Sequence, residues 1–395
     1  MLVQDFTIAA LPRIDFGPGA MLRAVGHALA LGRTVLLVTG SRSLDERGHL
    51  QRVIAAIEAG GGRWDRIVVA DEPSPDLVDA AVKHHANQGI DAVLAIGGGS
   101  VIDAGKAIAG LLKTGHSVME YLEGVGRGGT YAGPAIPLIA VPTTAGTGSE
   151  ATKNAVLSRR GPTGFKKSFR DEQLIARVAA IDPDLLAGAP APLLAANGMD
   201  ALTQLLESFT STRANPMTDA LAWSGMELFQ RHFLPFWHTR ASDPTGRAAI
   251  AYASLMSGIC LAQTGLGAVH GMAAAIGALA PAPHGIVCGT LLAETTATNI
   301  AALRQRLPES PALSKYAQVG RLFAGHDASR DHALDALVTT LRSWQETLAM
   351  PRLGSYGLTS DHGPHIARES RGSSMKTNPL PLVDAELLAI LNQRL

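Results

Sequence analysis

The stretch AIGGGSVIDAGK (Ala95–Lys106) ends an apolar run and begins a segment with helical spacing, and it is the part of the chain that decides the fold class. Its three consecutive glycines, Gly97, Gly98 and Gly99, allow the backbone to approach a ligand closely. The helix that follows presents free N–H groups and a partial positive charge, which suit a pyrophosphate. The same turn could also join a strand to a helix without any ligand, and it matches neither the G-x-G-x-x-G fingerprint nor the phosphate-loop motif.

A second glycine-containing loop, VPTTAGTGSE (Val141–Glu150), also follows an apolar run. It carries four hydroxyl side chains, which are those of Thr143, Thr144, Thr147 and Ser149. Because the carboxyl ends of parallel strands share one edge of a sheet, we expect this loop to lie beside the triple-glycine turn. Two such loops on one edge favour an extended ligand that carries phosphates, such as a dinucleotide.

The first half of the chain alternates between two kinds of segment around these loops. Apolar runs predict strands at Arg33–Gly40, Asp65–Ala70, Asp91–Ser100 and, continuing into the second loop, Ala135–Glu150. Helical spacing predicts helices at Leu44–Gly61, Pro75–Gly89 and Val101–Gly115. Strands that are apolar throughout and are separated by helices indicate a parallel sheet covered on both faces.

From about Pro192 the β-branched runs disappear and long segments rich in Ala, Leu and Met replace them. We therefore predict an α/β dinucleotide-binding domain with a Rossmann-like parallel sheet in residues 1–185. An all-α domain follows in residues 186–395, and we expect the ligand in the cleft between the two. The polar stretch Ser370–Leu382 is predicted to be a loop.

Composition limits the classes of function. The chain has 395 residues, of which 46% are hydrophobic, and its formal net charge is zero, which argues against nucleic acid as the main partner. Two cysteines are too few for a disulfide framework. We see no basic leader followed by an apolar run, and no uninterrupted apolar segment near the roughly 20 residues of a membrane span. A cytoplasmic protein that does not bind membranes is the expectation.

Four side chains of the second half suggest a metal. Asp200 and Gln204 lie four residues apart in NGMDALTQLLES (Asn197–Ser208), on one face of a helix. The stretch GAVHGMAAAIGALAPAPHG (Gly267–Gly285) adds His270 and His284 among small residues. A carboxylate, two imidazoles and an amide oxygen would suit a divalent ion such as Fe²⁺ or Zn²⁺. Taken alone, either histidine could instead be a satisfied core residue.

Several of these segments together resemble the iron-containing, or group III, alcohol dehydrogenases over nearly the whole chain. The segments are GGGSVIDAGK, PTTAGTGSE, IDPDL, MDALTQLLES and GAVHGMAAAIG with the later PHG. The resemblance implies the dehydroquinate synthase-like fold and an enzyme that interconverts alcohols with aldehydes or ketones. It also implies metal-assisted hydride transfer to or from NAD(H) or NADP(H), a small alcohol or aldehyde substrate, and a homo-oligomer, by family a dimer.

The resemblance also assigns residues. The cofactor-binding residues that it implies are Gly97, Gly98, Gly99 and Ser100 at the pyrophosphate, Asp103 in the following helix, Thr143, Thr144 and Thr147 along the cofactor, and Asn154 and Lys166 at the nucleotide. Lys167 is an alternative to its neighbour Lys166. The implied metal ligands are Asp200, Gln204, His270 and His284, of which Asp200, His270 and His284 are also the catalytic residues.

This chain departs from the family pattern at three positions. Gln204 stands where the family usually has a histidine, and its neutral amide is a weaker ligand than imidazole. Ala274 replaces a second histidine that is thought to help move protons. Gly40 stands where members that prefer NAD often carry an aspartate, and Arg42 follows two residues later. The missing acid and the nearby arginine favour NADP(H), or the use of both cofactors.

Four other functions fit part of this pattern. The chain is also similar to the maleylacetate reductases, which act on unsaturated oxo-acids without an essential metal, and Gln204 keeps that alternative open. Glycerol dehydrogenases and dehydroquinate synthases share the fold, although we find no convincing set of basic residues for the latter. A non-catalytic nucleotide-binding protein would bind the cofactor without turnover.

Overall fold

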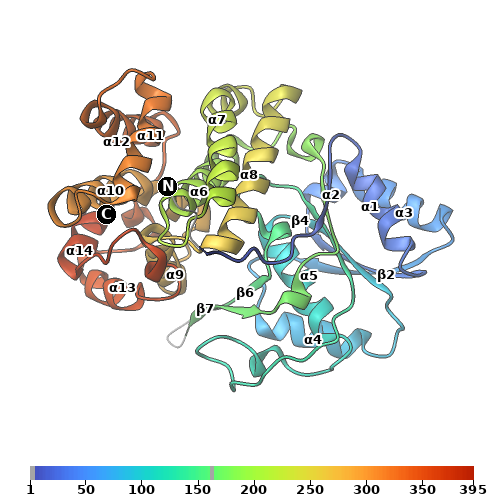
Figure 1. The fold of residues 1–395 in the computed structure, drawn as a ribbon. Helices are drawn as coiled ribbons and strands as arrows, with labels where there is room; N and C mark the ends of the chain where they lie inside the picture. The colour runs from blue at the N-terminus through green and yellow to red at the C-terminus, as the bar shows by residue number, and fades with distance from the viewer. Residues whose placement is uncertain (1–4, 161–163) are drawn as a thin grey trace. The chain divides into compact units, whose positions relative to one another are not determined.

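The computed structural model describes residues 5–160 and 164–395 and divides into two compact units (Figure 1). The first unit, the sheet unit, comprises Ala10–Thr144 and Gly148–Ala187. The second, the helical unit, comprises Gly188–Leu395 together with Ala145–Thr147 and, near the N-terminus, residues 5–9. The middle of the second glycine-containing loop, Ala145–Thr147, therefore belongs to the helical unit, although the residues on both sides of it belong to the sheet unit.

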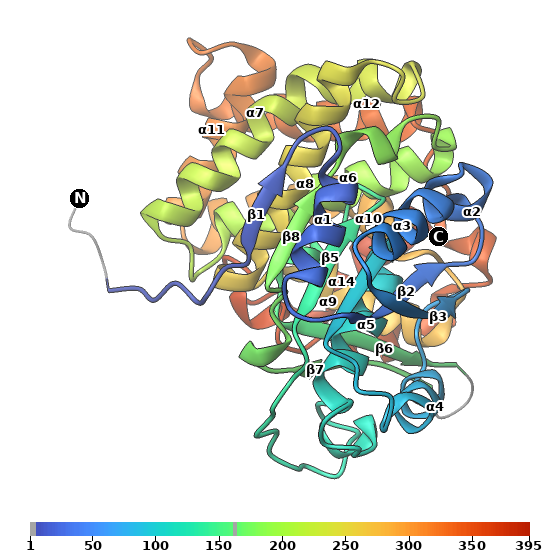
Figure 2. The same cartoon turned by 90° about the vertical axis from the view of Figure 1, so that its right-hand side faces the viewer.

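The sheet unit is built on six strands, all parallel to their neighbours, in the order β1-β8-β5-β4-β2-β3. The strands are β1 Arg13–Phe16, β2 Thr34–Gly40, β3 Arg63–Val69, β4 Ala92–Gly97, β5 Leu138–Pro142 and β8 Val178–Ile181. Figure 2 shows β1, β8 and β5 side by side. The parallel sheet that the apolar runs predict is confirmed.

Helices cover both faces of this sheet. Along β2 the side chains alternate, with Leu36 and Val38 in one apolar core and Val35 and Leu37 in the other. The first core includes α4 (Pro75–His85) and α5 (Gly99–Leu111), and the second includes α1 (Ala20–Leu29) and α3 (His49–Ala59), as Figure 1 illustrates. Strands that are buried on both sides need no polar alternation, which explains their continuous apolar sequences.

The strand order places the triple-glycine turn at a functional edge of the sheet. The chain runs outward from β2 to β3 and then returns to the other side of β2 as β4, so the order reverses between β2 and β4. Ligands of open α/β sheets bind at the carboxyl ends of strands at such a reversal. Gly97 at the end of β4 pairs with Pro142 of β5, and the Thr143 N–H donates to the Gly97 carbonyl at 3.0 Å. The two glycine-containing loops therefore lie side by side, as predicted.

Three features differ from the sequence-based expectation. The single helix predicted over Leu44–Gly61 is wrong, because the structure has α2 (Ser43–Glu46) and α3, separated at Gly48 with φ of +68°. The four-residue strands β1 and β8 have too few residues for a visible pattern. After the second loop the chain forms an antiparallel hairpin of β6 (Asn154–Arg159) and β7 (Phe165–Arg170), which we did not expect.

The helical unit contains the elements from α6 onward. Its helices are α6 Ala191–Thr210, α7 Pro216–His238, α8 Pro244–Thr264, α9 Ala268–Leu279, α10 His284–Arg306, α11 Pro311–Ala324, α12 Arg330–Thr347, α13 Gly363–Glu369 and α14 Asp384–Arg394. Helix α6 packs against α7, α8 and α10, and α9 packs against α10. Among the described residues, α10 alone is long and apolar enough for a membrane span, but 83% of that window is buried, as in a core helix.

Candidate functional site

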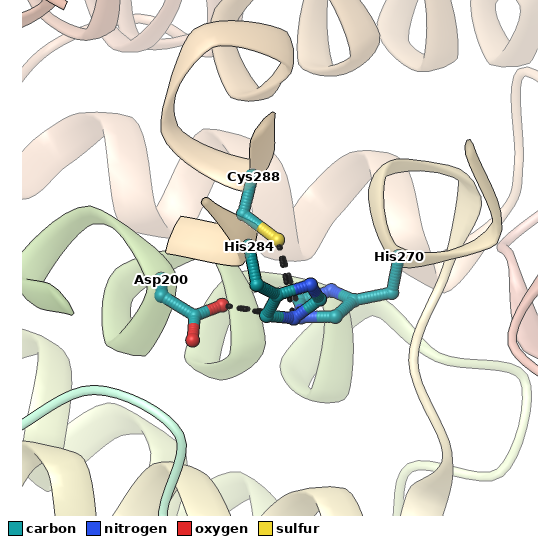
Figure 3. Close-up of side chains that lie close together, drawn as sticks. All are labelled: Asp200, His270, His284 and Cys288. Atoms are coloured by element: carbon teal, nitrogen blue, oxygen red, sulfur yellow. Dashed lines mark hydrogen bonds and ion pairs between the residues drawn. The ribbon is translucent and has the colours of Figure 1, made fainter. Parts of the chain in front are cut away.

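Four side chains of the helical unit bring their ligand atoms together (Figure 3). Asp200 comes from α6, His270 from α9, and His284 and Cys288 from α10. One atom of each, a carboxylate oxygen, two imidazole nitrogens and a thiol sulfur, lies within 4.8 Å of all the others. We call these four residues the donor cluster.

Small residues allow the three helices to approach closely enough to form the donor cluster. A Cβ atom at Gly285, next to His284, would lie 2.5 Å from the backbone oxygen of Ala196 in α6. A Cβ at Gly271, next to His270, would lie 2.9 Å from the backbone oxygen of Ser370. Both separations are too short for any larger residue, so the glycines beside the histidines are required by packing.

A carboxylate outside the donor cluster fixes the orientation of His270. The Nδ1 atom of His270 lies 2.7 Å from Glu207 Oε2, and Glu207 Oε1 accepts the N–H of Val269 at 2.7 Å. Glu207 thereby occupies the N-terminus of α9, where free N–H groups favour an anion. In the neutral ring, Nδ1–H donates to Glu207 and the lone pair of Nε2 faces the donor cluster, which is the arrangement of a histidine that binds a metal.

Asp200 lacks the hydrogen bonds that a buried carboxylate needs. Its side chain is nearly fully buried, and its Oδ1 atom makes no hydrogen bond to any described residue. The Nε2 atoms of His270 and His284 lie 3.3 and 3.8 Å from that oxygen, without hydrogen-bond geometry. Burial raises the pKa of Asp200, but the two imidazoles lower it further, so that the net shift is downward. A buried, ionised oxygen that makes no hydrogen bond and lies close to two imidazole nitrogens and a thiol fits a cation site.

Cys288 is the member of the donor cluster that sequence reasoning missed. Its Sγ atom lies 3.6 Å from the Nε2 atoms of both His270 and His284. In the metal-free chain, burial raises the pKa of the thiol to about 12. The available signal was spacing, because Cys288 follows His284 by four residues and therefore lies on the same face of α10.

The amide oxygen of Gln204 has a partner elsewhere. The side chain is buried, and Oε1 accepts a hydrogen bond from the Ser257 hydroxyl of α8 at 2.9 Å. Three of the four predicted metal residues thus lie together in the donor cluster, and Gln204 as a ligand stays a prediction. Burial lowers the pKa of His270, but Cys288, Asp200 and Glu207 together raise it well above the usual value.

The predicted pyrophosphate residues lie at the N-terminus of α5, where backbone N–H groups can donate to a ligand. Gly98 is the N-cap of α5 and offers no side-chain cap, and Gly98, Gly99 and Ser100 are partly exposed. A Cβ atom at Gly98 would lie 3.4 Å from Thr144 Oγ1, which places the second loop beside this turn. Thr143, Thr144 and Thr147 are likewise partly exposed. This arrangement can bind an anion through the backbone.

Asp103 belongs to a buried polar network in the sheet unit. It accepts hydrogen bonds from the Ser149 hydroxyl and from the N–H of Val156, the latter at 3.1 Å. Lys106 is fully buried and donates to Ser149 Oγ, Thr152 Oγ1 and the carbonyl of Asn154, at 2.9, 2.8 and 2.8 Å. Two predicted nucleotide contacts, Asp103 and Asn154, therefore also connect α5 to the second loop and to β6. Sequence reasoning assigned no role to Lys106.

The predicted contact Lys166 lies on β7 and donates to Glu72, which also accepts the Ser158 hydroxyl at 2.6 Å. Its alternative, Lys167, is exposed. Near Gly40 at the end of β2, Arg42 is exposed, and Arg66 donates to Thr39 Oγ1 at 2.8 Å and pairs with Asp45. These arginines are the basic groups near the position where the family's acidic residue would stand.

Comparison with known families matches both parts of the chain. The model described as iron-containing alcohol dehydrogenase matches residues 12–183, and the model described as Fe-containing alcohol dehydrogenase family, C-terminal, matches residues 194–395. Together the two matches cover nearly all of the chain.

Individual relatives agree with these models. A 1,3-propanediol dehydrogenase of Citrobacter freundii is 35% identical over 301 residues, which are 74% of this chain and 75% of the relative. The crystal structure of a 1,3-propanediol oxidoreductase has a TM-score of 0.88 at 28% identity and covers 99% of this chain and 100% of that one. A sulfoacetaldehyde reductase of Bifidobacterium kashiwanohense, solved in complex with NAD⁺, has a TM-score of 0.84 at 25% identity, with 99% of each chain covered.

Proposed function

The chain belongs to the iron-containing alcohol dehydrogenase family, and we propose that it interconverts an alcohol with an aldehyde or ketone by metal-assisted hydride transfer to or from NAD(P). The observation that supports this most strongly is the donor cluster. It brings together a buried carboxylate oxygen that makes no hydrogen bond among the described residues and two imidazole nitrogens. The relatives named above are oxidoreductases of alcohols or aldehydes, which supports the same reaction class here.

In this proposal the sheet unit binds the nucleotide. The free N–H groups at the start of α5 bind the pyrophosphate, and Gly97, Gly98 and Gly99 admit it because they carry no Cβ. Ser100, Thr143, Thr144 and Thr147 supply hydroxyls along the same edge. Asp103, Asn154 and Lys166 complete the proposed set, with the first two also acting through their internal contacts.

In the helical unit, Asp200, His270 and His284 would hold a divalent cation, Fe²⁺ or Zn²⁺. Such an ion, when bound, acts as a Lewis acid toward the oxygen of the alcohol or carbonyl group. Glu207 keeps the Nε2 lone pair of His270 directed at the site by accepting the hydrogen of Nδ1. The His284 side chain is 30% exposed, so the donor cluster is open to small molecules on that side.

We further propose NADP(H), or the use of both cofactors, because Gly40 lacks the carboxylate that repels a 2′-phosphate and Arg42 is exposed nearby. Comparing kcat/KM with NADPH and NADH on one substrate tests this. A strong preference for NADH would contradict it.

The test of the reaction class is a screen of small alcohols and aldehydes with both cofactors, followed by the absorbance of the reduced nicotinamide. On the best substrate, His270→Ala and His284→Ala should lower kcat by at least about 100-fold while nucleotide affinity changes little, because the proposed metal acts in the chemical step. His365→Ala is the matched control, since this histidine is exposed and contacts the guanidinium of Arg368. Unchanged kcat in both cluster variants would contradict the proposal.

The engagement of Gln204 with Ser257 supports one alternative, a reductase of an unsaturated oxo-acid without an essential metal. Under that alternative, activity toward such an acid survives a chelator, and the enzyme does not act on simple alcohols.

The family resemblance supports a homo-oligomer, in the simplest case a dimer, and sedimentation of the purified protein tests it. A cytoplasmic location is proposed on the same basis, and both cysteines are free and buried in keeping with it.

A further inference from the structure

We infer that Cys288, rather than Gln204, is the fourth protein ligand of the cation, so that the centre is formed by Asp200, His270, His284 and Cys288. This inference rests on the proposed function, because it concerns the metal site of that function. It changes the ligand set that family resemblance alone would assign to this chain.

Three of the distances between the donor atoms match the edges of a tetrahedral metal site. With metal–nitrogen and metal–oxygen bonds of about 2.0–2.1 Å and a metal–sulfur bond of about 2.3 Å, a tetrahedron has nitrogen–sulfur edges of about 3.6 Å and nitrogen–oxygen edges of about 3.3 Å. Cys288 Sγ lies 3.6 Å from both Nε2 atoms, and Asp200 Oδ1 lies 3.3 Å from that of His270. The remaining nitrogen–oxygen edge, to His284, is 3.8 Å.

Two further observations indicate that this grouping is a ligand site. The Asp200 Oδ1 atom is buried and has no hydrogen bond among the described residues, although the Nε2 atoms of His270 and His284 lie 3.3 and 3.8 Å away. Figure 3 shows all four side chains directed toward one small volume from three helices. A cysteine that only filled space in the core would be equally stable if its thiol packed against apolar side chains instead of two imidazoles.

Helix spacing would allow either Cys288 or Gln204 to bind the cation, and a hydrogen bond distinguishes them. His284 and Cys288 lie one turn apart on α10 and therefore project from the same face. Gln204 lies one turn after Asp200 on α6, but its amide oxygen accepts the hydroxyl hydrogen of Ser257. To bind the cation, Gln204 would have to give up this buried hydrogen bond.

The substitution of donor changes the chemistry of the centre. A thiolate is anionic and soft, so together with Asp200 it supplies two negative charges that balance a divalent ion, whereas Gln204 would be neutral. Sulfur and imidazole donors in tetrahedral geometry are typical of Zn²⁺. We therefore expect this centre to retain Zn²⁺ more tightly than Fe²⁺.

The test uses the full-length protein loaded with Zn²⁺ or Co²⁺. X-ray absorption of the Zn²⁺ protein should show one sulfur neighbour at about 2.3 Å. The Co²⁺ protein should show a thiolate-to-metal charge-transfer band in the near ultraviolet. Both measurements use the unmodified chain, so they do not depend on the folding of any variant.

Three variants make the assignment specific. Cys288→Ser should abolish the charge-transfer band and weaken metal binding by more than about 100-fold, since even loss of an outer partner costs 10–100-fold. Cys260→Ser is the matched control, because Cys260 is the other buried cysteine and contacts the carbonyl of Thr218. The charge-transfer band of the Cys260→Ser protein should be unchanged. Gln204→Met, which keeps the volume and removes the amide, should also retain the band.

The possible failures are distinguishable. Metal that binds stoichiometrically with no sulfur neighbour, or a band that survives in Cys288→Ser, overturns the role of Cys288 and leaves the proposed function standing. Metal affinity that falls in Gln204→Met but is unchanged in Cys288→Ser returns the fourth position to Gln204. If no divalent ion binds at one equivalent per chain, both the inference and the metal-assisted function fail.

Discussion

Glu207 shows, at the scale of single residues, how the donor cluster depends on a group outside it. Its two oxygens accept the N–H of Val269 and the Nδ1–H of His270 from one position. The residue therefore sets both the start of α9 and the direction of the His270 ring. It contacts neither substrate nor cofactor in our account and is a positioning residue.

Replacing this carboxylate should loosen the metal site without disturbing the nucleotide. We expect Glu207→Gln to weaken metal affinity by about 10–100-fold, as removal of such partners generally does. Nucleotide affinity, measured by fluorescence of bound NADPH, should stay within about twofold of wild type. Metal affinity is measured by competition with a chromophoric chelator. An unchanged metal affinity would show that His270 does not need Glu207, and Glu207→Asp, which restores the charge, should recover part of the loss.

Glu150 provides a residue-scale prediction on pH. Burial raises its pKa from 4.5 to about 7, an effect that nearby Lys106 only partly offsets. Between these values the folded chain keeps the proton and the unfolded chain releases it, so stability falls as the pH rises from about 4.5 to 7. The effect corresponds to roughly 3 kcal/mol at most.

Glu150→Gln should remove this dependence, because the amide does not titrate. The free energy of unfolding, measured in urea, should rise for the variant relative to wild type as the pH rises from 5 to 8. The variant is thus relatively more stable at pH 8 than at pH 5. Glu369→Gln, at an exposed site, is the control and should not alter the pH profile. Parallel pH profiles for wild type and Glu150→Gln would contradict the assignment.

Candidate site residues could be predicted from sequence where an ionisable side chain lies among apolar neighbours. They could not be predicted where the residue type is common in that setting. Asp200, His270 and His284 are conspicuous because polar groups are costly among Ala and Leu. Cys288 reads as a small apolar residue and Lys106 as a solvent-exposed one, although the latter is fully buried. Only the tertiary structure shows that each meets a set of partners.

At the scale of elements, the N-terminus of α5 is the feature on which nucleotide binding depends. Gly98 has φ of −73°, which any residue can adopt, so its glycine is not required by the backbone. A Cβ at this position would meet Thr144 at ordinary contact distance. The glycine is therefore better explained by a ligand that approaches the backbone between the two loops.

Gly98→Ala should consequently fold normally but bind nucleotide about tenfold more weakly, a loss of about 1.4 kcal/mol. Titration of NADPH fluorescence measures the affinity, and thermal unfolding checks the fold. Gly26→Ala is the matched control, because a Cβ at this position of α1 meets nothing within 4 Å. Equal nucleotide affinity in both variants would remove the triple-glycine turn from the cofactor site.

The strands β2, β4 and β5 were predictable because burial on both faces requires continuous apolar sequence. The edge strand β3 is largely exposed, and only the apolar second half of its sequence, RWDRIVV, indicated a strand. The two shortest strands were not predictable, since β1 and β8 have four residues each and pair through contacts between distant parts of the chain. The break between α2 and α3 was missed because the helical pattern continues across Gly48, whose left-handed conformation ends one helix and begins the next.

At the scale of the whole molecule, the two classes of fold in one chain follow from a single change in composition near residue 190. Parallel strands and helices precede it and helices alone follow it, as the sequence predicts. The interleaving of the two units at Ala145–Thr147 could not be predicted, because it depends on contacts that the local pattern does not encode. Gly146 in this segment lies against Asn197, where a Cβ would be only 3.0 Å away.

The central claim is that a divalent ion at the donor cluster is required for alcohol–aldehyde interconversion. The most direct test is to strip the enzyme with a chelator, measure metal content and kcat together, and titrate Zn²⁺ or Fe²⁺ back. Our account predicts that activity is lost with the metal and returns in proportion to it, saturating at one ion per chain, and that Asp200→Asn neither binds the ion nor recovers activity. Full turnover of an alcohol or aldehyde by the metal-free enzyme would contradict it.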